Sequence, residues 1–285
     1  MRAIAYVNGE FIPQDEAKIS IMDRGFLFSD GIYEVAAVLS GKLVDNDLHM
    51  ARLERSVGEI GLALPETTAR ITELMLELVA RNSLTEGLVY LQVTRGAEAT
   101  RNFAFPKDSK PSLVMFCDFK TYADTPQAKT GIKVKTVEDI RWARRDIKSV
   151  ALLAQVLAKQ AAAAEGCQEA WMHEDGVVTE GGSSTAYIVK GEGDSARIIT
   201  RPNSRKILPG CTRKAMLSLA EETGIEIEER LFTVEEAYHA REAFITSATS
   251  FIMPVTEIDG RKIGGGQVGP VARRLRELYI EHARG

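Results

Sequence analysis

Cysteine is scarce in this 285-residue chain, and its three copies, Cys117, Cys167 and Cys211, are isolated from one another. An odd number of scattered cysteines argues against a disulfide framework. The chain also has only four histidines, and these do not combine with the cysteines into a zinc-binding spacing. We therefore expect a protein with neither structural disulfides nor a bound metal.

Long apolar runs and a charge excess are missing as well. No segment is long and apolar enough to cross a bilayer, and the N-terminal residues lack the apolar region of a secretory signal. The formal net charge is -4, which gives no general attraction to nucleic acid or to an anionic membrane. These features predict a cytoplasmic protein that binds neither nucleic acid nor membrane.

The composition, 45% hydrophobic and 27% charged, is typical of a globular protein, and the length favours two domains. Residues 121–130 are polar and rich in turn formers, which makes them the best candidate for a linker. The sequence thus predicts an N-terminal domain over residues 1–120 and a C-terminal domain over residues 131–285.

Hydrophobic spacing predicts short strands mixed with helices. Asn8-Gly9 and Ser40-Gly41 each separate two short apolar runs, as in β-hairpins. The segments expected to be helical are 47–60, 66–81, 150–165, 212–223, 234–240 and 271–283. The expected strands are 4–7, 10–12, 35–39, 42–44, 88–94, 112–117, 132–136, 169–173, 177–179, 186–189, 196–200 and 243–247.

The stretch Val137–Ser149 carries three arginines and ends beside an Ala-rich run that begins at Val150. Ser149 is expected to be the N-cap of that helix, and Gly166 its C-terminal stop. Lys148 therefore lies where an apolar helix meets a basic cluster. Burial and nearby positive charge both lower the pKa of a lysine, which makes its amine nucleophilic. A solvated lysine is the ordinary alternative.

Two segments are rich in hydrogen-bond donors. Ile207–Lys214 places Gly210 and Thr212 where an amphipathic helix starts, and free N–H groups at a helix start bind anions. The alternative is an ordinary N-cap at Thr212. The turn Ile245–Ser250 has a similar composition, and its alternative is a polar loop.

Three further features could carry chemistry. Glu180 ends a predicted strand and could pair with a cationic ring nitrogen, or be a surface glutamate. Arg101 is suited to a two-point grip on a carboxylate, or is a solvated loop residue. Gly264–Gly269 matches the dinucleotide fingerprint, but no strand follows to complete a βαβ unit, so we expect a turn before the last helix.

Taken together, these pieces resemble the fold-type IV pyridoxal-phosphate enzymes, the class IV aminotransferases, and among them the D-amino acid aminotransferases. The resemblance covers nearly the whole chain, and the block Val137–Ser149 is its most specific part. The motifs that carry it, in order, are Asp23-Arg-Gly25, Gly31-Ile-Tyr-Glu34, His49-Met-Ala-Arg-Leu53, Val93-Thr-Arg-Gly96, Val137–Ser149, Leu157-Ala-Lys-Gln160, Gly166-Cys167, Thr179-Glu-Gly181, Gly210 with Thr212-Arg213, and Pro254-Val255.

The resemblance implies an α+β fold with a smaller N-terminal domain, a larger C-terminal domain and pyridoxal 5′-phosphate between them. It implies that Lys148 holds the cofactor as a Schiff base and, once freed, moves a proton between the substrate and the cofactor. Glu180 corresponds to the partner of the pyridine nitrogen, and Leu208 to the apolar residue beneath the ring. Tyr33 corresponds to an active-site tyrosine.

For the cofactor phosphate, the resemblance implies two donor-rich segments and one arginine. Arg52 matches the arginine. The residues that match the donor-rich segments are Gly210, Cys211 and Thr212 in the first, and Ser247, Ala248 and Thr249 in the second.

The chain departs from the family pattern at two places. Ala248 stands where relatives carry threonine, so one hydroxyl contact is lost. D-amino acid aminotransferases commonly hold the substrate carboxylate with an Arg-x-His pair; Arg101 fits the arginine, but Phe103 stands at the histidine position. An ungapped register from Arg95 puts Thr100 and Asn102 there instead.

The leading hypothesis is transamination between a D-amino acid of the D-alanine type and a 2-oxo acid such as 2-oxoglutarate, by a homodimer. The alternatives within the family are a branched-chain L-amino acid aminotransferase, an aminodeoxychorismate lyase and an (R)-selective amine transaminase. The alternative outside the enzymes is a module that binds a phosphate ester. A nicotinamide-dependent enzyme is not expected.

Overall fold

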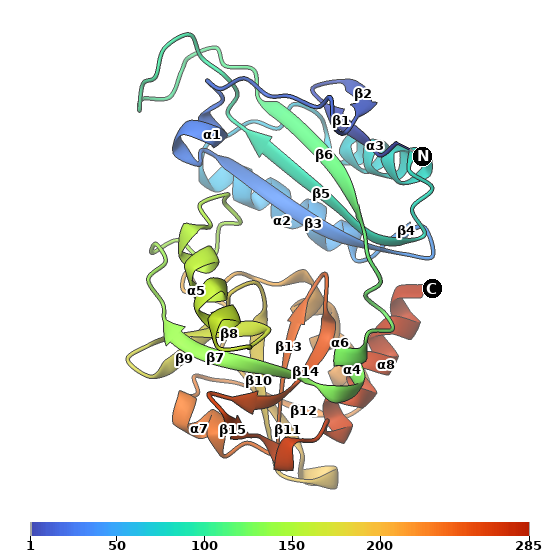
Figure 1. Cartoon of the computed structure of the whole chain (residues 1–285), viewed down its shortest axis with the longest axis vertical. Coiled ribbons are helices and arrows are strands. Elements are labelled where there is room, and N and C mark those ends of the chain that lie inside the picture. Colours follow the sequence, from blue (N-terminus) through green and yellow to red (C-terminus); the bar gives the residue numbers. More distant parts are fainter. Residues whose placement is uncertain (1, 285) are drawn as a thin grey trace. The chain divides into compact units, whose positions relative to one another are not determined.

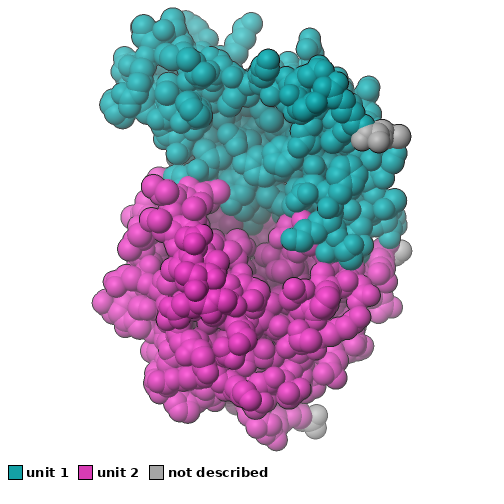
Figure 2. Space-filling model, in the orientation of Figure 1, with its two compact units in different colours: residues 1–121, 147–151 teal, residues 122–146, 152–285 magenta. Residues whose placement is uncertain are grey.

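The computed structural model describes residues 2–284, which divide into two compact units. Unit 1 consists of Met1–Thr121 and Ile147–Ala151, and unit 2 of Tyr122–Asp146 and Leu152–Gly285 (Figure 2). The segment expected to be a linker, 121–130, contains a short helix, α4 (Pro126–Thr130), that packs on a strand of unit 2. The five residues around Lys148 belong to unit 1, although the chain on both sides of them belongs to unit 2.

Unit 1 is a six-stranded antiparallel sheet with two long helices (Figure 1). The strand order is β2-β1-β6-β5-β3-β4. Helix α2 packs against β3, and α3 against β1 and β6. The elements are β1 (Ile4–Val7), β2 (Glu10–Pro13), α1 (Arg24–Phe28), β3 (Gly31–Leu39), β4 (Lys42–Leu43), α2 (Asn46–Glu59), α3 (Thr68–Arg81), β5 (Glu86–Thr94) and β6 (Ser112–Phe119).

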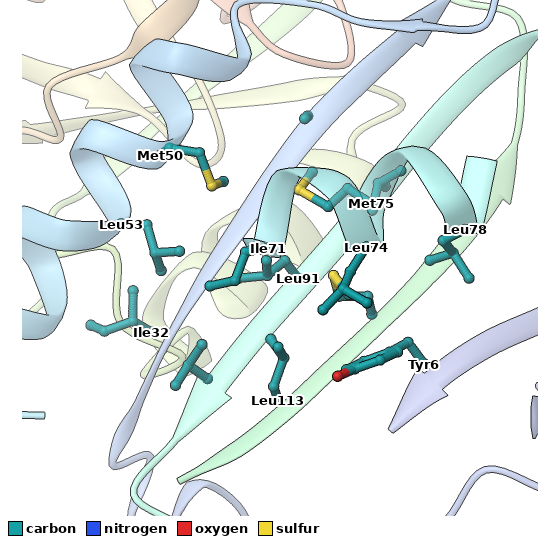
Figure 3. Close-up of a cluster of buried hydrophobic side chains, with 14 of the residues drawn as sticks. Tyr6, Ile32, Met50, Leu53, Ile71, Leu74, Met75, Leu78, Leu91 and Leu113 are labelled. Atoms are coloured by element: carbon teal, nitrogen blue, oxygen red, sulfur yellow. The ribbon is translucent and has the colours of Figure 1, made fainter. Parts of the chain in front are cut away.

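The core of unit 1 confirms the helical spacing read from the sequence. Apolar residues on one face of α3 and one face of α2 meet those of the sheet, and Figure 3 shows their side chains directed toward one another. Its members include Ile32, Leu53, Ile71, Leu74, Met75, Leu78 and Leu91. Both predicted hairpins are also present, and their turns at Asn8-Gly9 and Ser40-Gly41 have positive φ at both residues.

Unit 2 is built on a nine-stranded mixed sheet (Figure 1). Its order is β12-β11-β10-β13-β14-β7-β8-β9, with β15 paired to β14. Helix α5 packs on β7 and β8, whereas α6 and α8 pack on each other and on β13. The elements are α4, β7 (Ile132–Glu138), α5 (Leu153–Ala164), β8 (Glu169–Glu174), β9 (Val177–Gly181), β10 (Thr185–Lys190), β11 (Arg197–Thr200), α6 (Cys211–Glu222), β12 (Glu226–Glu229), α7 (Val234–Tyr238), β13 (Glu242–Ser247), β14 (Phe251–Ile258), β15 (Arg261–Lys262) and α8 (Pro270–Arg284), with single 3₁₀ turns at Gly193–Ser195 and Gly264–Gly266.

The α+β fold class is confirmed, and so are the long helices and most strands. Two helix starts were placed wrongly. Ser149 caps no helix, because α5 begins at Leu153 and Ser149 bridges to Ile32 as an extended residue. The N-cap of α6 is Gly210 rather than Thr212. The predicted turn at Gly264–Gly269 is confirmed.

Some elements of the fold differ from the sequence-based prediction. Strand β14 was missed because Pro254 argues against a central strand. Pro254 is tolerated because the pairing of β14 with β7 begins one residue later, at Val255. Residues 24–28, which lie in none of the helices expected from the sequence, form the short helix α1, and Phe26 on it is 69% exposed.

Candidate active site

The backbone around Lys148 is bound to the free edge of β3. Strand β4 covers only the far end of β3, at Val38 and Leu39, and so leaves the first residues of β3 without a strand on that side. Residues 147–150 take that place. The Tyr33 N–H donates to the Lys148 carbonyl at 3.0 Å, and the Val150 N–H donates to the Gly31 carbonyl at 3.1 Å.

The side chain of Lys148 lies on an aromatic face of the same sheet. Its Nζ is 4.1 Å from the centroid of the Tyr33 ring, and the residue is half-buried. Tyr33 stacks on Tyr90 at 5.7 Å, and Tyr90 stacks on Phe116 at 4.8 Å. Three strands thus supply a rigid column of rings, and Tyr33 at its end contacts the amine. The structure brings together Lys148 and Tyr33, two of the residues singled out from the sequence.

Arg52 belongs to a buried ion cluster that sequence reasoning missed. Its guanidinium donates to both oxygens of Glu34, at 2.8 Å and 2.7 Å, and His49 Nδ1 lies 2.8 Å from Glu34 Oε2. Burial alone would raise the pKa of Glu34, but Arg52 and His49 lower it well below its ordinary value. Glu34 is therefore a fixed anion that orients Arg52. Glu34 lies in the motif Gly31-Ile-Tyr-Glu34, and His49 and Arg52 lie in the motif His49-Met-Ala-Arg-Leu53. The titratable residues in these two motifs were the sequence feature that could have indicated the cluster.

Glu180 lies at the end of β9 and is 4% exposed. It forms an ion pair with Arg141, and it accepts the Leu208 N–H at 3.2 Å and 3.1 Å on its two oxygens. Burial raises the pKa of Glu180 above its ordinary value in spite of Arg141 and the Leu208 N–H. The structure thus brings together Glu180 and Leu208, as expected of one site.

Arg141 is shared with a second acid, Asp139. Two of its nitrogens donate to the two oxygens of Asp139, at 2.9 Å and 2.7 Å. Burial by itself would raise the pKa of Asp139, but the hydrogen bonds from Arg141 lower it. Asp139 also accepts a 2.6 Å hydrogen bond from the Thr179 hydroxyl. Arg145 also lies 3.2 Å from Asp139, so of the two acids that share Arg141, Asp139 has a second cation beside it. The arginines of Val137–Ser149 indicated such a cluster, but not its partners.

The two donor-rich segments expected at a phosphate both belong to unit 2. Gly210 is the N-cap of α6, and Cys211 and Thr212 are buried in its first turn. No side chain caps this helix start, so its N–H groups can bind an anion. A Cβ on Gly210 would lie 3.1 Å from the Thr185 hydroxyl, so a larger residue would crowd this turn.

The second donor-rich segment is a tight turn between β13 and β14. The Ser250 N–H donates to the Ser247 Oγ at 3.1 Å, and the two serine hydroxyls are 2.6 Å apart. Ser247, Ala248 and Thr249 are half-buried. The turn is thus closed by hydrogen bonds between its own two serines.

Arg101 and Phe103 lie in the loop between β5 and β6 and are exposed, Phe103 by 74%. Arg101 is 4.7 Å from the Phe28 ring and 5.1 Å from the Phe103 ring. Arg24 binds the backbone of this loop: it donates to the carbonyls of residues 102 and 103 at 2.6 Å and 3.1 Å. The structure therefore places these two residues with Phe28 and Arg24, and their predicted role at a substrate carboxylate stays a prediction.

Metal-binding and membrane-spanning features are both absent from the described part of the chain. Within residues 2–284, no three His, Cys, Asp or Glu side chains are grouped so as to hold a metal ion. None of the helices described there combines the length and hydropathy needed to span a bilayer.

The chain matches a family of known proteins over most of its length. Residues 31–258 match the model of the family described as amino-transferase class IV. A D-alanine aminotransferase from Staphylococcus haemolyticus is 43% identical over 282 residues, which are 97% of each chain. One from Bacillus licheniformis is 39% identical and covers 94% of this chain and 93% of its own.

Solved structures agree on the fold. A branched-chain amino acid aminotransferase from Escherichia coli superposes with a TM-score of 0.92 at 22% identity, over 99% of this chain and 95% of its own. A second branched-chain amino acid aminotransferase, solved with pyridoxamine 5′-phosphate, superposes with a TM-score of 0.89 at 26% identity, over 99% of this chain and 94% of its own.

Proposed function

The chain belongs to the class IV aminotransferases, and we propose that it exchanges the amino group of a D-amino acid of the D-alanine type with a 2-oxo acid such as 2-oxoglutarate. Its cofactor is pyridoxal 5′-phosphate. The observation that carries the proposal is the half-buried Lys148 amine against Tyr33, in a chain 43% identical to a D-alanine aminotransferase over nearly its whole length.

The donors and acceptors of the chain fit this cofactor. When bound, pyridoxal 5′-phosphate supplies an aldehyde that condenses with amines and a ring that accepts electrons from the substrate. Glu180 is buried, and burial raises its pKa, so a cationic nitrogen beside it would be stabilised and would in turn keep Glu180 ionised. We assign Glu180 to the ring nitrogen, with Leu208 fixing the orientation of the carboxylate through its N–H group.

A phosphate dianion suits the two donor-rich segments. The start of α6 at Gly210–Thr212 supplies N–H groups and the positive end of a helix, and the turn at Ser247–Thr249 supplies a second set. The loss of a hydroxyl at Ala248 leaves the backbone N–H there. We assign Arg52, held by Glu34, as the cation of this set.

Lys148 is the proton carrier of the proposal. Its Nζ is held on Tyr33 by a segment whose backbone is bound to β3. Because that segment is fixed, the amine returns to one place each time it is released. Such a positioned base speeds proton transfer by about 100- to 10,000-fold.

The role of Lys148 can be tested chemically. Borohydride reduction of the holoenzyme, followed by peptide mass mapping, should attach one pyridoxyl group at Lys148. Lys148→Ala should lose this label and nearly all activity, whereas Lys262→Ala, an exposed lysine on β15, should keep both. A label elsewhere, or none in the wild type, would remove the assignment and favour a non-catalytic phosphate-binding module.

The substrate assignment can be tested with a panel of candidate substrates. D-Alanine should convert the visible band of the cofactor to that of pyridoxamine phosphate, whereas L-leucine should leave it unchanged. Conversion by L-leucine alone would establish the branched-chain alternative. Pyruvate release from aminodeoxychorismate would establish the lyase. Conversion by an (R)-amine that has no carboxylate would agree with Phe103 standing in place of a histidine at the carboxylate position.

We further propose a cytoplasmic homodimer whose two units are the two domains of the enzyme. Three phenylalanines of α1 and the β5–β6 loop are largely exposed: Phe26 by 69%, Phe103 by 74% and Phe105 by 62%. Exposed aromatic side chains on neighbouring segments of one unit would suit a contact surface, and the three free cysteines suit a reducing compartment.

The dimer can be tested by light scattering during size exclusion. The wild type should have twice the 31.3 kDa mass of one chain, and joint replacement of Phe103 and Phe105 by serine should lower the measured mass. Phe119→Ser, at a phenylalanine that is 54% exposed at the end of β6, is the matched control. A fully active monomer would contradict the proposal.

A further inference from the structure

Phe251, the first residue of β14, has an unusual backbone conformation. Its φ is +55°, although it is completely buried. The other described non-glycine residues with positive φ are all Asn, Ser or Asp, which tolerate the left-handed region, whereas a bulky apolar residue does not favour it. Some feature of the surroundings must therefore hold the chain here.

Arg276 of helix α8 binds the backbone on both sides of Phe251. Its Nη1 donates to the carbonyls of Ser250 and Ile252, both at 2.7 Å, so one nitrogen grips the chain on either side of Phe251. The Phe251 ring packs on Tyr279, one turn further along the same helix, at 5.4 Å. Backbone and side chain of Phe251 are thus both held by α8, which packs on β14 (Figure 1).

The other nitrogen of the guanidinium binds a distant segment. Nη2 donates to the carbonyls of Tyr122 and Ala123, at 2.7 Å and 3.0 Å. Arg276 is 6% exposed, and burial lowers its pKa to about 10, which leaves it charged at neutral pH. Its four hydrogen-bond acceptors are neutral carbonyls, and the charge of Asp124 acts against the effect of burial on its pKa.

The held segment ends the donor-rich turn described above. Ser250, whose carbonyl Arg276 grips, closes this turn through its hydrogen bonds to Ser247. We propose that Arg276 is a positioning residue for phosphate binding: by fixing Phe251 in the left-handed conformation, it sets the direction of the N–H groups of residues 247–249. This inference rests on the proposed function, in which that turn binds the cofactor phosphate.

The test compares two ligands that differ only in the phosphate. Arg276→Lys keeps the charge, but its single ammonium cannot span four carbonyls. It should weaken the binding of pyridoxal 5′-phosphate to the cofactor-free full chain by roughly 10- to 100-fold, as a displaced binding group does. Binding of pyridoxal should change by less than about twofold, since it makes no phosphate contact. Arg274→Lys, an exposed arginine of the same helix, should change neither.

The outcomes separate the inference from its premise. An Arg276→Lys variant that binds both ligands as the wild type does, or that loses both equally, overturns the inference. A wild type that binds pyridoxal as tightly as pyridoxal 5′-phosphate overturns the proposed phosphate site itself.

A second measurement uses the wild-type chain alone. It therefore tests the role of Arg276 even if Arg276→Lys fails to fold. Inorganic phosphate added to the cofactor-free wild type should slow amide hydrogen exchange at residues 248–252 and, through the shared guanidinium, at residues 122–124. Slowing at the turn alone would show that Arg276 does not couple the two segments, and would overturn the inference.

Discussion

At the scale of single residues, burial and the charged neighbours of each group decide the pKa values of two acids in this protein. Glu34 and Glu180 are both almost completely buried, yet their pKa values shift in opposite directions. Glu34 is paired with Arg52 and hydrogen-bonded to His49, whereas Glu180 shares Arg141 with Asp139. One carboxylate is thus permanently charged, and the other can be tuned by a ligand.

The pH dependence of stability follows from Glu34. Because its pKa is lowered in the folded state, its contribution is complete above the ordinary value of 4.5 and is lost as the pH falls. Glu34→Gln should cost about 3 kcal/mol at pH 7, since it leaves the buried Arg52 guanidinium without its anion, and should flatten the loss of stability in acid. Urea titrations between pH 3 and 7 measure both effects. Glu66→Gln, at an exposed acid of unit 1, is the control, and an unchanged acid slope in Glu34→Gln would contradict the account.

Glu180→Gln should separate the role of the acid from its packing. Glutamine keeps the shape but cannot stabilise a cationic ring nitrogen, so kcat should fall by about 100-fold or more, and the variant should still fold. Steady-state kinetics with D-alanine measure the loss, and Glu226→Gln, on an exposed residue of β12, provides the comparison. A variant with wild-type kcat would show that Glu180 has no part in the reaction.

At the scale of elements, the decisive contact is between residues 147–151 and the edge of β3. It is made by backbone groups: the Tyr33 N–H, the Val150 N–H and their two carbonyl partners. Neither hydrophobic periodicity nor capping signals reveal such a pairing, because any sequence with free N–H groups can make it. The apolar pattern therefore extends the predicted helix back to Val150, where the structure has an extended segment.

Val150→Pro should detach this segment. Proline removes the N–H that binds the Gly31 carbonyl, and the Lys148 amine would lose its fixed position on Tyr33. We expect activity with D-alanine to fall by about 100-fold, with a smaller loss of stability, about 1 to 3 kcal/mol. Activity assays and thermal unfolding measure the two. Val150→Ala keeps the N–H and should retain most of the activity; equal loss in both variants would point to the side chain instead.

At the scale of the whole molecule, the chain is two compact units, each of which contains residues that the proposal above assigns to the cofactor. Lys148 and Arg52 belong to unit 1, and Glu180 and Thr212 to unit 2. Each unit has its own buried core. We infer that a bound cofactor adds to the stability of both.

Removal of the cofactor should therefore lower the thermal stability of both units. A ligand present at 100 times its dissociation constant adds about 2.7 kcal/mol to the folded state. Calorimetry of the holoenzyme and the cofactor-free enzyme should show the loss, and hydrogen exchange should place it in β3 as well as in β9. Protection lost from one unit only would show that the other unit's residues do not bind the cofactor.

The sequence by itself determined both hairpins and the long amphipathic helices, because these depend on local spacing and turn chemistry, and its motifs implied the α+β class through the family resemblance. It also singled out Lys148, Glu180 and Leu208 through resemblance. The tertiary structure decided which groups meet: that Lys148 lies on Tyr33, that Arg141 serves two acids, and that Arg276 grips four carbonyls. Such contacts join residues up to 154 positions apart, and no periodicity along a chain encodes the partner of a buried charge.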